Sequence, residues 1–372
     1  MFLTSLKLEN YRNIKAINLE FKEGKNLVIV QGKNAQGKTN LLEAISFLSV
    51  PQAFFKRSLA SCLKEDEPYF NIEGTFASND ELSAFNEVFE GFNSTKKIRF
   101  FYDNEKGKFM FRNDVETDLK DYVGNLKTVI FTPEDIQLVS KSPQKRRRFI
   151  DRLLIQTNPD YFMNLSKFNK VLKNRNALLK NRSNEILLSS TDKLFAKNAL
   201  EVYKARYEFL EFLRLNIENI YISLSDPSQK IEIKVNSIDH KNLNAEFILE
   251  KLNSLREKDF IYGHTNFGPH RDDFEILKSN QKISEYGSRG ERRTVVLALK
   301  IAELEYLKTK CILTPILLLD DVFSELDEKR RYNLMQISKK YQTIVTTVET
   351  DYFKNLKSDQ FQLLKLEAGQ LL

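Results

Sequence analysis

The chain has 372 residues, 41% of them hydrophobic and 29% charged, and its 58 Lys and Arg against 51 Asp and Glu leave a formal net charge of +7. This length and composition can fill the cores of two or three domains and exclude a disordered chain, while the basic excess allows a polyanionic partner. Two distant cysteines and three dispersed histidines exclude a disulfide framework and a zinc cluster, and without a signal-peptide pattern or a bilayer-length apolar run we expect a cytoplasmic protein with no membrane partner.

The first third of the chain predicts mainly β-structure. Residues 3–21 alternate apolar and polar side chains about a polar turn at 10–13, which predicts two paired strands. Residues 26–30 form a β-branched run typical of a buried parallel strand, and residues 38–49 repeat apolar residues at helical spacing. Further strands are predicted at 70–76, 98–102, 109–112 and 129–131.

The middle of the chain, residues 144–224, is predicted to be almost wholly helical, with Pro159 where a helix can begin. Apolar residues recur at near-heptad spacing in two stripes, which are Tyr161, Leu165, Phe168, Leu172 and Leu179, then Tyr203, Tyr207, Leu210, Ile217 and Leu224. Polar breaks at 181–184 and 189–191 separate the stripes, so we predict two antiparallel helices that form an arm roughly 30 Å long. An ordinary packed hairpin inside a domain is the alternative, because a stripe shows only that some surface covers it.

The last third alternates strands and helices. A strand at 231–235 and a helix at 245–255 precede a polar, glycine-containing region at 263–273. A helix at 291–308, an apolar strand at 316–319, a charged helix at 328–340 and a strand at 343–348 are then predicted.

A phosphate-binding pattern stands between the predicted strand at 26–30 and the helix after it. The pattern G-x-x-x-x-G-K-[ST] is matched by Gly32, Lys33, Asn34, Ala35, Gln36, Gly37, Lys38 and Thr39. The glycines let successive backbone N–H groups point at phosphates, and the helix N-terminus adds the positive end of its dipole. Lys38 would supply a cation to the β- and γ-phosphates and Thr39 a hydroxyl to Mg²⁺. We therefore predict a site for a nucleotide with Mg²⁺.

Two adjacent carboxylates end the later apolar strand. A Mg²⁺ held by one hydroxyl needs a carboxylate at the end of a neighbouring strand, so Asp320 is the predicted metal ligand. Asp321 is placed to orient or deprotonate the attacking water, and with Lys38 it would carry the catalysis. The long separation of Lys38 from Asp320 means that the middle of the chain is inserted into one nucleotide-binding core. The chain shows no N-K-x-D guanine-reading tetrapeptide, which favours ATP.

A third motif, GSRGERR at 287–293, begins the helix predicted at 291–308. A serine, a loop and a helix N-terminus can form a second phosphate cradle, although S-x-G-E alone equally describes a simple capped helix. Its place between the two other motifs favours the phosphate role for Ser288.

The order of these motifs, completed by SELD at 324–327, is similar to that of ABC-type ATPases, and the chain resembles the RecF family of bacterial recombinational repair nearly end to end. The most specific stretches are 32–45, 131–135 leading through 142–143 to 146–151, 268–273 and 319–327. The resemblance implies an α/β fold, an ABC-type P-loop ATPase head like lobe I of Rad50 and SMC proteins, with an inserted, mainly helical second lobe that carries a short antiparallel helical arm. It places the first part of lobe I, with the Walker A loop at 32–39, at residues 1–131. Lobe II, with the signature motif GSRGERR at 287–293, would span residues 132–311. The second part of lobe I, with the Walker B strand and its carboxylates at 316–321 and the D-loop SELD at 324–327, would span residues 312–372.

The resemblance also implies that two protomers sandwich ATP and Mg²⁺. Ser288 and Gly290 would act on the nucleotide bound by the other protomer, and Asp327 would lie across the same interface. Asn40 belongs to the matching loop, and Arg12 resembles an N-terminal arginine that contacts nucleotide. We therefore expect an ATP-dependent homodimer on gapped duplex, single-stranded and double-stranded DNA, with RecO and RecR as partners in loading RecA.

The chain departs from transporter ATPases in ways that RecF-like sequences share. Asp321 stands where transporters carry glutamate, and Thr346-Thr347 stands where they carry a histidine that senses the γ-phosphate. A shorter carboxylate without an imidazole predicts a slow, DNA-stimulated ATPase that acts as a switch. Either Gln137 or Glu134 could replace the missing Q-loop glutamine.

DNA contact is predicted for the basic residues Lys145, Arg146, Arg147 and Arg148, and for Lys56 and Arg57. The basic residues come without interleaved aromatic residues, which predicts contacts to phosphates with little base preference. A solvated helix start would look the same. Two other functions stay open, namely an ABC-type ATPase that drives a protein partner without DNA contact and a nucleotide-binding scaffold that does not hydrolyse ATP.

Overall fold

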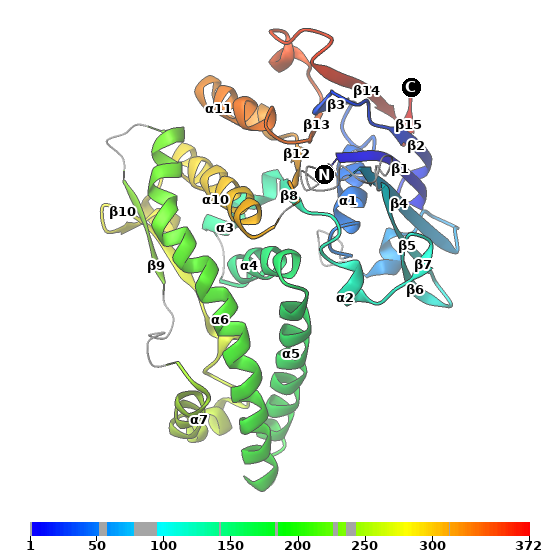
Figure 1. Ribbon diagram of the computed structural model, residues 1–372. Helices are drawn as coiled ribbons and strands as arrows, with labels where there is room; N and C mark the ends of the chain where they lie inside the picture. The colour runs from blue at the N-terminus through cyan, green and yellow to red at the C-terminus, as the bar shows by residue number, and fades with distance from the viewer. Residues whose placement is uncertain are drawn as a thin grey trace, which may run out of the picture. The chain divides into compact units, whose positions relative to one another are not determined.

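The computed structural model describes residues 2–51, 58–77, 95–140, 143–182, 185–225, 230–235, 243–311 and 313–372 (Figure 1). The chain divides into two compact units, of which unit 1 comprises Met1–Asp135 with Glu303–Leu372 and unit 2 comprises Ile136–Ala302. The domain boundaries at 131/132 and 311/312 stay a prediction. Within the described ranges, no helix combines the length and the apolar character needed to cross a membrane.

Unit 1 contains two six-stranded sheets. The antiparallel sheet has the order β2-β1-β4-β5-β6-β7, formed by β1 Phe2–Tyr11, β2 Ile14–Glu20, β4 Tyr69–Ala77, β5 Thr95–Asp103, β6 Gly107–Arg112 and β7 Val115–Glu116. The other sheet has the order β15-β14-β3-β13-β12-β8, formed by β3 Leu27–Gln31, β8 Thr128–Phe131, β12 Ile316–Asp320, β13 Thr343–Thr347, β14 Phe361–Glu367 and β15 Gln370–Leu371. Its strands are parallel except β15.

Helix α1, Lys38–Phe47, contacts strands of both sheets and is buried along most of its length. Its last residue, Phe47, joins an aromatic cluster with Tyr11, Phe70 and Phe100, whose ring centroids lie 5.3–6.3 Å from its own. Rings meeting edge to face add to the apolar area that they bury. The start of α1, where a nucleotide-binding loop is predicted, is therefore anchored by a well-packed core.

The predicted strands of unit 1 are confirmed, but the sequence analysis missed β7, β14 and β15. β14 pairs in parallel with β3 and so extends the central sheet. Its burial alternates, but Gln362 on the inward side is 7% exposed and Leu363 on the outward side is 44% exposed, so the sequence lacks a period-two signal. The remaining helices of this unit are α2 Leu119–Tyr122, the end of α10, and α11 Glu328–Ser338. Described 3₁₀ turns of the chain lie at Leu59–Cys62, Pro133–Ile136, Pro269–Arg271, Val322–Glu325 and Asp351–Phe353.

Unit 2 is mainly helical and carries one small sheet. Its helices are α3 Gln137–Ser140, α4 Pro143–Thr157, α5 Pro159–Lys180, α6 Glu185–Leu224, α7 Ala245–Ser254, α8 Arg256–Tyr262, α9 Ile283–Tyr286 and the first part of α10 Arg289–Lys310. The sheet has the order β11-β10-β9, formed by β9 Ile231–Val235, β10 Phe274–Lys278 and β11 Gln281–Lys282. Figure 1 shows α5 and α6, in green, side by side as the predicted helical arm.

Two details of the predicted arm were wrong. The helix does not break at 189–191, because α6 runs for 40 residues and the hydroxyls of Ser190 and Thr191 donate to the carbonyls of Ile186 and Leu187, at 2.9 and 2.8 Å. Such bonds back to the preceding turn let polar residues stay inside a helix. Tyr207 does not belong to the buried stripe, since it is 38% exposed.

A buried ion cluster in the arm was not foreseen. Arg175 of α5 is fully buried, and its guanidinium lies 2.6 Å from carboxylates of Asp192 on α6 and Asp259 on α8. The same guanidinium donates to the Thr265 hydroxyl at 2.8 Å. Buried charges require such partners, because desolvation penalises each ion alone. The arginine therefore ties three helices together at a position where the sequence shows only a polar residue.

Candidate nucleotide-binding site

Close backbone approaches shape the loop between β3 and α1. A Cβ atom added to Gly32 would lie 2.5 Å from the backbone oxygen of Leu366 on β14. Gly37 has a φ of +101°, and a Cβ there would lie 2.7 Å from Oδ1 of Asn13. Ala35 also has a positive φ, of +64°. Any larger residue at position 32 or 37 would displace these neighbouring atoms, which explains why both positions of the motif are glycine.

Lys38 lies within the curl of this loop. Its Nζ donates to the carbonyl oxygens of Gly32 and Lys33, at 2.7 and 2.8 Å, and the residue is 7% exposed. Burial lowers the pKa of Lys38, while the charges of Asp321 and Asp320 act in the opposite direction. An ammonium held inside a ring of backbone groups is the arrangement that a P-loop lysine requires to reach phosphates.

Thr39 and Asp320 meet at the start of α1. The Thr39 hydroxyl donates to Oδ2 of Asp320 at 2.7 Å, and the hydroxyl of Thr346 on β13 donates to Oδ1 at 2.7 Å. A hydroxyl and a carboxylate on adjacent elements form the oxygen donor set that Mg²⁺ shares with a nucleotide. Within the described ranges no group of three or more His, Cys, Asp or Glu side chains is placed to hold a metal ion.

The structure gives Thr346 an orienting part that the sequence analysis did not assign. Its hydroxyl oxygen lies between Oδ1 of Asp320 and the backbone N–H of Asp321, at 2.7 and 3.1 Å. The sequence signal for this role is the position of Thr346 near the end of β13. This strand runs parallel to β12, and Thr346 pairs with Asp320. One hydroxyl thus orients both carboxylate-bearing residues.

Asp321 has an unusual backbone. Its φ is +50°, and the turn is held by the N–H of Asp321 donating to the Thr346 carbonyl at 3.1 Å and by the Ser324 hydroxyl donating to the Asp321 carbonyl at 2.7 Å. Left-handed backbone in a non-glycine residue stores strain, which is typical of functional sites. Burial raises the pKa of its carboxyl group, and the positive charge of Lys38 opposes this shift. A raised pKa suits a carboxylate that takes up a proton.

Arg12 and Asn40 hold the flank of the loop. Arg12 forms a 2.6 Å ion pair with Glu43 of α1, which also accepts a 2.7 Å hydrogen bond from the Tyr11 hydroxyl. Asn40 donates to the side chain of Asn13 at 2.7 Å. The nucleotide contacts expected for Arg12 and Asn40 stay predictions, and the observed bonds show how β1 and α1 are held together.

The loop is also held from the C-terminal side of the chain. Gln36 accepts a 3.1 Å hydrogen bond from the N–H of Gly369 through its carbonyl, and its side chain accepts one from the N–H of Ala368. Asn34 and Lys33 complete the same loop.

The predicted dimer-contact residues begin helices. Ser288 of unit 2 is exposed, and its hydroxyl oxygen accepts from the N–H of Glu291 at 3.2 Å at the start of α10, where Gly290 also lies. Asp327 of unit 1 is exposed and accepts from the N–H of Arg330 at 3.0 Å at the start of α11. Both side chains therefore cap helices. Their contact with a nucleotide or a second protomer stays a prediction.

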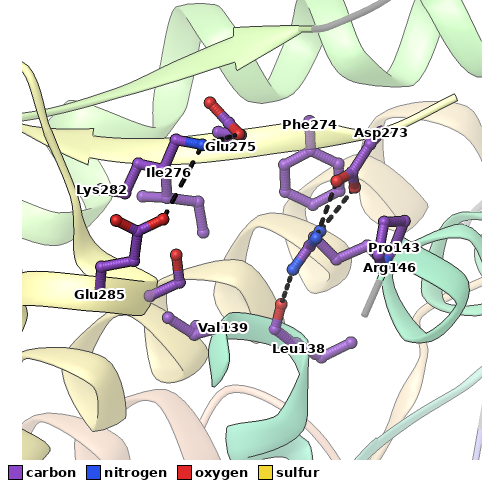
Figure 2. A pocket seen from close by; sticks show the side chains of 11 residues that line it. Leu138, Val139, Pro143, Arg146, Asp273, Phe274, Glu275, Ile276, Lys282 and Glu285 are labelled. Carbon is purple, nitrogen blue, oxygen red and sulfur yellow. Dashed lines mark hydrogen bonds and ion pairs between the residues drawn. The ribbon is translucent and has the colours of Figure 1, made fainter. Parts of the chain in front are cut away.

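The basic run on α4 is partly engaged within unit 2. Figure 2 shows Arg146 facing Asp273, with both guanidinium–carboxylate bonds at 2.7 and 2.8 Å, and also donating to the Leu138 carbonyl. Arg147 donates to the carbonyl of Asp272 at 2.7 Å. Lys145 and Arg148 lie in the same run with intermediate exposure, and burial lowers the pKa of Arg148. Lys56 and Arg57 lie outside the described residues.

Comparisons with known proteins agree over nearly the whole chain. The family model described as RecF/RecN/SMC N terminal domain matches residues 2–370. The chain is 35% identical to the DNA replication and repair protein RecF of Lysinibacillus sphaericus, covering 100% of this chain and 99% of that protein. It is 36% identical to the protein of the same name from Acetivibrio thermocellus, over 100% and 99%.

Solved structures show the same architecture. A structure of the recombination mediator protein RecF with ATP, in the RecFOR pathway, matches with a TM-score of 0.86 and 32% identity, covering 100% of this chain and 97% of that one. The Smc head domain of Pyrococcus furiosus matches with a TM-score of 0.54 at 16% identity, over 100% and 95%, which concerns the fold alone. The predicted ABC-type head fold is thereby confirmed, and the chain belongs to the RecF family of DNA replication and repair proteins.

Proposed function

We propose that this protein is a slow, DNA-stimulated ATPase of recombinational repair that binds DNA as an ATP-dependent homodimer. The observation that carries the proposal is the arrangement of Lys38, Thr39 and Asp320 around one loop, in a chain whose relative has been solved with ATP. The same relative is a recombination mediator of the RecFOR pathway, which supports RecO and RecR as partners in loading RecA at gapped DNA.

The loop residues fit a triphosphate with Mg²⁺. The backbone from Gly32 to Thr39 and the Lys38 ammonium would bind the phosphates, and Thr39 with Asp320 would hold the metal. Bound Mg²⁺ neutralises charge on the phosphates and orients them. Asp321 would accept the proton of the attacking water, and its raised pKa supports that part.

A second protomer would complete the site. Ser288, Gly290 and Asp327 are at helix starts, and the first and last of them are exposed, so they are accessible to a partner. The partner subunit's Ser288 would reach the nucleotide held by the first protomer, as the family resemblance implies. Pairing would therefore depend on ATP, and hydrolysis would release it.

Sizing the protein by sedimentation, with and without ATP and a gapped duplex, tests this proposal. We expect a dimer with ATP, a ternary complex with DNA, and neither for Lys38→Ala, while Lys22→Ala at an exposed site should behave as the parent protein. Ser288→Arg should keep ATP binding by the protomer and block pairing. A dimer formed by Ser288→Arg with ATP would contradict the sandwich.

An ABC-type ATPase that drives a protein partner without DNA contact is the second candidate. The engagement of Arg146 and Arg147 by oxygens of their own unit favours it. ATP-dependent pairing without any DNA binding at low salt would support this alternative.

A further inference from the structure

One carboxylate organises the signature motif at the start of α10. Oε2 of Glu291 accepts from the backbone N–H of Ser288 at 2.7 Å, while the hydroxyl oxygen of Ser288 accepts from the N–H of Glu291 at 3.2 Å. This reciprocal pair is a capping box. The box uses a lone pair of the Ser288 oxygen, so the hydroxyl hydrogen is left to donate elsewhere.

Lys278, the last residue of β10, occupies the other oxygen of the same carboxylate. Its ammonium pairs with Oε1 of Glu291, and the two side chains are 27% and 24% exposed. The bond from Lys278, followed by the bond from the Ser288 N–H, lowers the pKa of Glu291 to about 2. Glu291 therefore stays ionised at neutral pH and is bound at both oxygens, which restricts its rotamer and the box that depends on it.

The backbone beside Ser288 is restricted from the other side. A Cβ on Gly287 would lie 2.7 Å from the carbonyl oxygen of Ile283, and the N–H of Gly287 donates to that oxygen at 3.1 Å. Arg292 donates to the same oxygen at 3.3 Å. The signature segment is thus held against α9 on one side and through Glu291 to β10 on the other.

We propose that Lys278 is a positioning residue for the signature motif, which holds Glu291 so that the Ser288 hydroxyl is presented to the nucleotide bound by a second protomer. Lys278 acts through Glu291 and does not itself touch the nucleotide. The inference rests on the proposed ATP-dependent homodimer and adds to it a residue outside the recognised motifs.

The test replaces Lys278 and a matched lysine on the same hairpin. Lys282 is the control, because its ammonium pairs with Glu275 at 2.6 Å and its side chain lines the pocket of Figure 2. For Lys278→Met we expect half-maximal pairing of protomers to require an ATP concentration about two- to fivefold higher. This fold-change corresponds to the free energy of a partly exposed ion pair. ATP affinity of the isolated protomer and the unfolding temperature should not change. Lys278→Arg should restore pairing, and Lys282→Met should match the parent protein.

A double-mutant cycle separates positioning from general destabilisation. Glu291→Gln keeps an acceptor for the Ser288 N–H but loses the charge, so Lys278→Met added to it should weaken pairing no further. Two outcomes would overturn the inference and leave the proposed function intact. In the first, the losses of pairing in Lys278→Met and Glu291→Gln add in the double variant. In the second, Lys278→Met pairs as the parent protein does while Ser288→Arg does not pair. If the Ser288→Arg protein still forms a dimer with ATP, both the proposed ATP sandwich and this inference are contradicted.

Discussion

The hydroxyl of Thr39 donates a 2.7 Å hydrogen bond to Asp320, although the two residues are 281 positions apart in the chain. Thr39 is the second residue of α1, directly after the glycine-bearing loop, and Asp320 ends β12. The contact brings together the two oxygen donors expected of a Mg²⁺ site. The remaining coordination of Mg²⁺ would come from phosphates and water.

Removing the charge of Asp320 should remove the metal-dependent part of ATP binding. We expect Asp320→Asn to bind ATP equally with Mg²⁺ and with a chelator, whereas the parent protein binds more tightly with Mg²⁺. Thr346→Val deletes the hydroxyl that orients Asp320, and it should weaken Mg²⁺-dependent binding about tenfold, as loss of an outer-shell partner does. ATP titrations with and without Mg²⁺ measure both. A strong Mg²⁺ dependence in Asp320→Asn would place the metal elsewhere.

Asp321 should separate ATP binding from turnover. Asp321→Asn retains size and hydrogen bonding but cannot accept a proton, so we expect unchanged ATP affinity and turnover reduced about a hundredfold or more. The paired state should persist longer after ATP is diluted, which sedimentation can follow. Asp351→Asn, at an exposed carboxylate on the same unit, is the control. Unchanged turnover in Asp321→Asn would mean that another group accepts the proton.

The buried Arg175 cluster should be essential for the stability of the arm. Arg175→Met leaves Asp259 buried without its cation and Asp192 with Arg256 alone, which costs about 3–5 kcal/mol of unfolding free energy. Arg214→Met removes an exposed pair with Glu211 from the same α6 and should leave the unfolding transition unchanged. Urea denaturation followed by circular dichroism measures the difference. Equal transitions for both variants would show that the cluster is not needed.

His270 should make stability depend on pH. Burial, followed by the positive charges of nearby arginines, lowers the pKa of His270 from 6.5 to about 4. The contact of its Nε2 with the Thr265 carbonyl at 3.0 Å opposes this shift. Between these pH values the unfolded chain binds a proton at His270 that the folded chain excludes. The contribution of His270 to stability is therefore full above pH 6.5 and is lost as the pH falls toward 4.

The comparison with His270→Gln isolates this contribution. From pH 7 to pH 5 the parent protein should lose about 1–2 kcal/mol more unfolding free energy than the variant does. Other groups titrate equally in both proteins, so only the difference between the two pH profiles is used. Parallel profiles would mean that the folded and unfolded chains bind protons alike at His270.

The basic run on α4 should divide into DNA-binding and structural residues. Lys145→Ala and Arg148→Ala should weaken DNA binding, and each should flatten the dependence of log affinity on log salt by about one unit, because one phosphate fewer is neutralised. Arg146→Ala should mainly destabilise unit 2, because it leaves the carboxylate of Asp273 without its bidentate partner. Fluorescence anisotropy at several salt concentrations measures the first effect. If a protein carrying both Lys145→Ala and Arg148→Ala shows the same slope of log affinity against log salt as the parent protein, these two residues do not contact DNA.

Local patterns made much of the fold predictable. The glycine-bearing loop, the strand that precedes it and the helix that follows are neighbours in sequence, so spacing alone revealed them. The strand at 316–319 showed its buried, parallel nature by its continuous apolar run, and it is observed at Ile316–Asp320. The capped start of α10 was readable for the same reason, since Ser288 and Glu291 are three residues apart.

Pairings between distant residues were decided only by tertiary structure. Arg146 and Asp273 are 127 positions apart, and nothing near either residue shows that they meet. Arg175 carries no signal in its local sequence, yet packing of three helices buries it with two carboxylates. By itself the sequence determined the glycine-bearing loop between a strand and a helix, the Asp320-Asp321 pair at the end of an apolar strand, and most of the regular elements, because these depend on short-range spacing. The contacts of Thr39, Thr346 and Lys278 required the folded chain, because a hydrogen bond between elements depends on how the whole core packs them together.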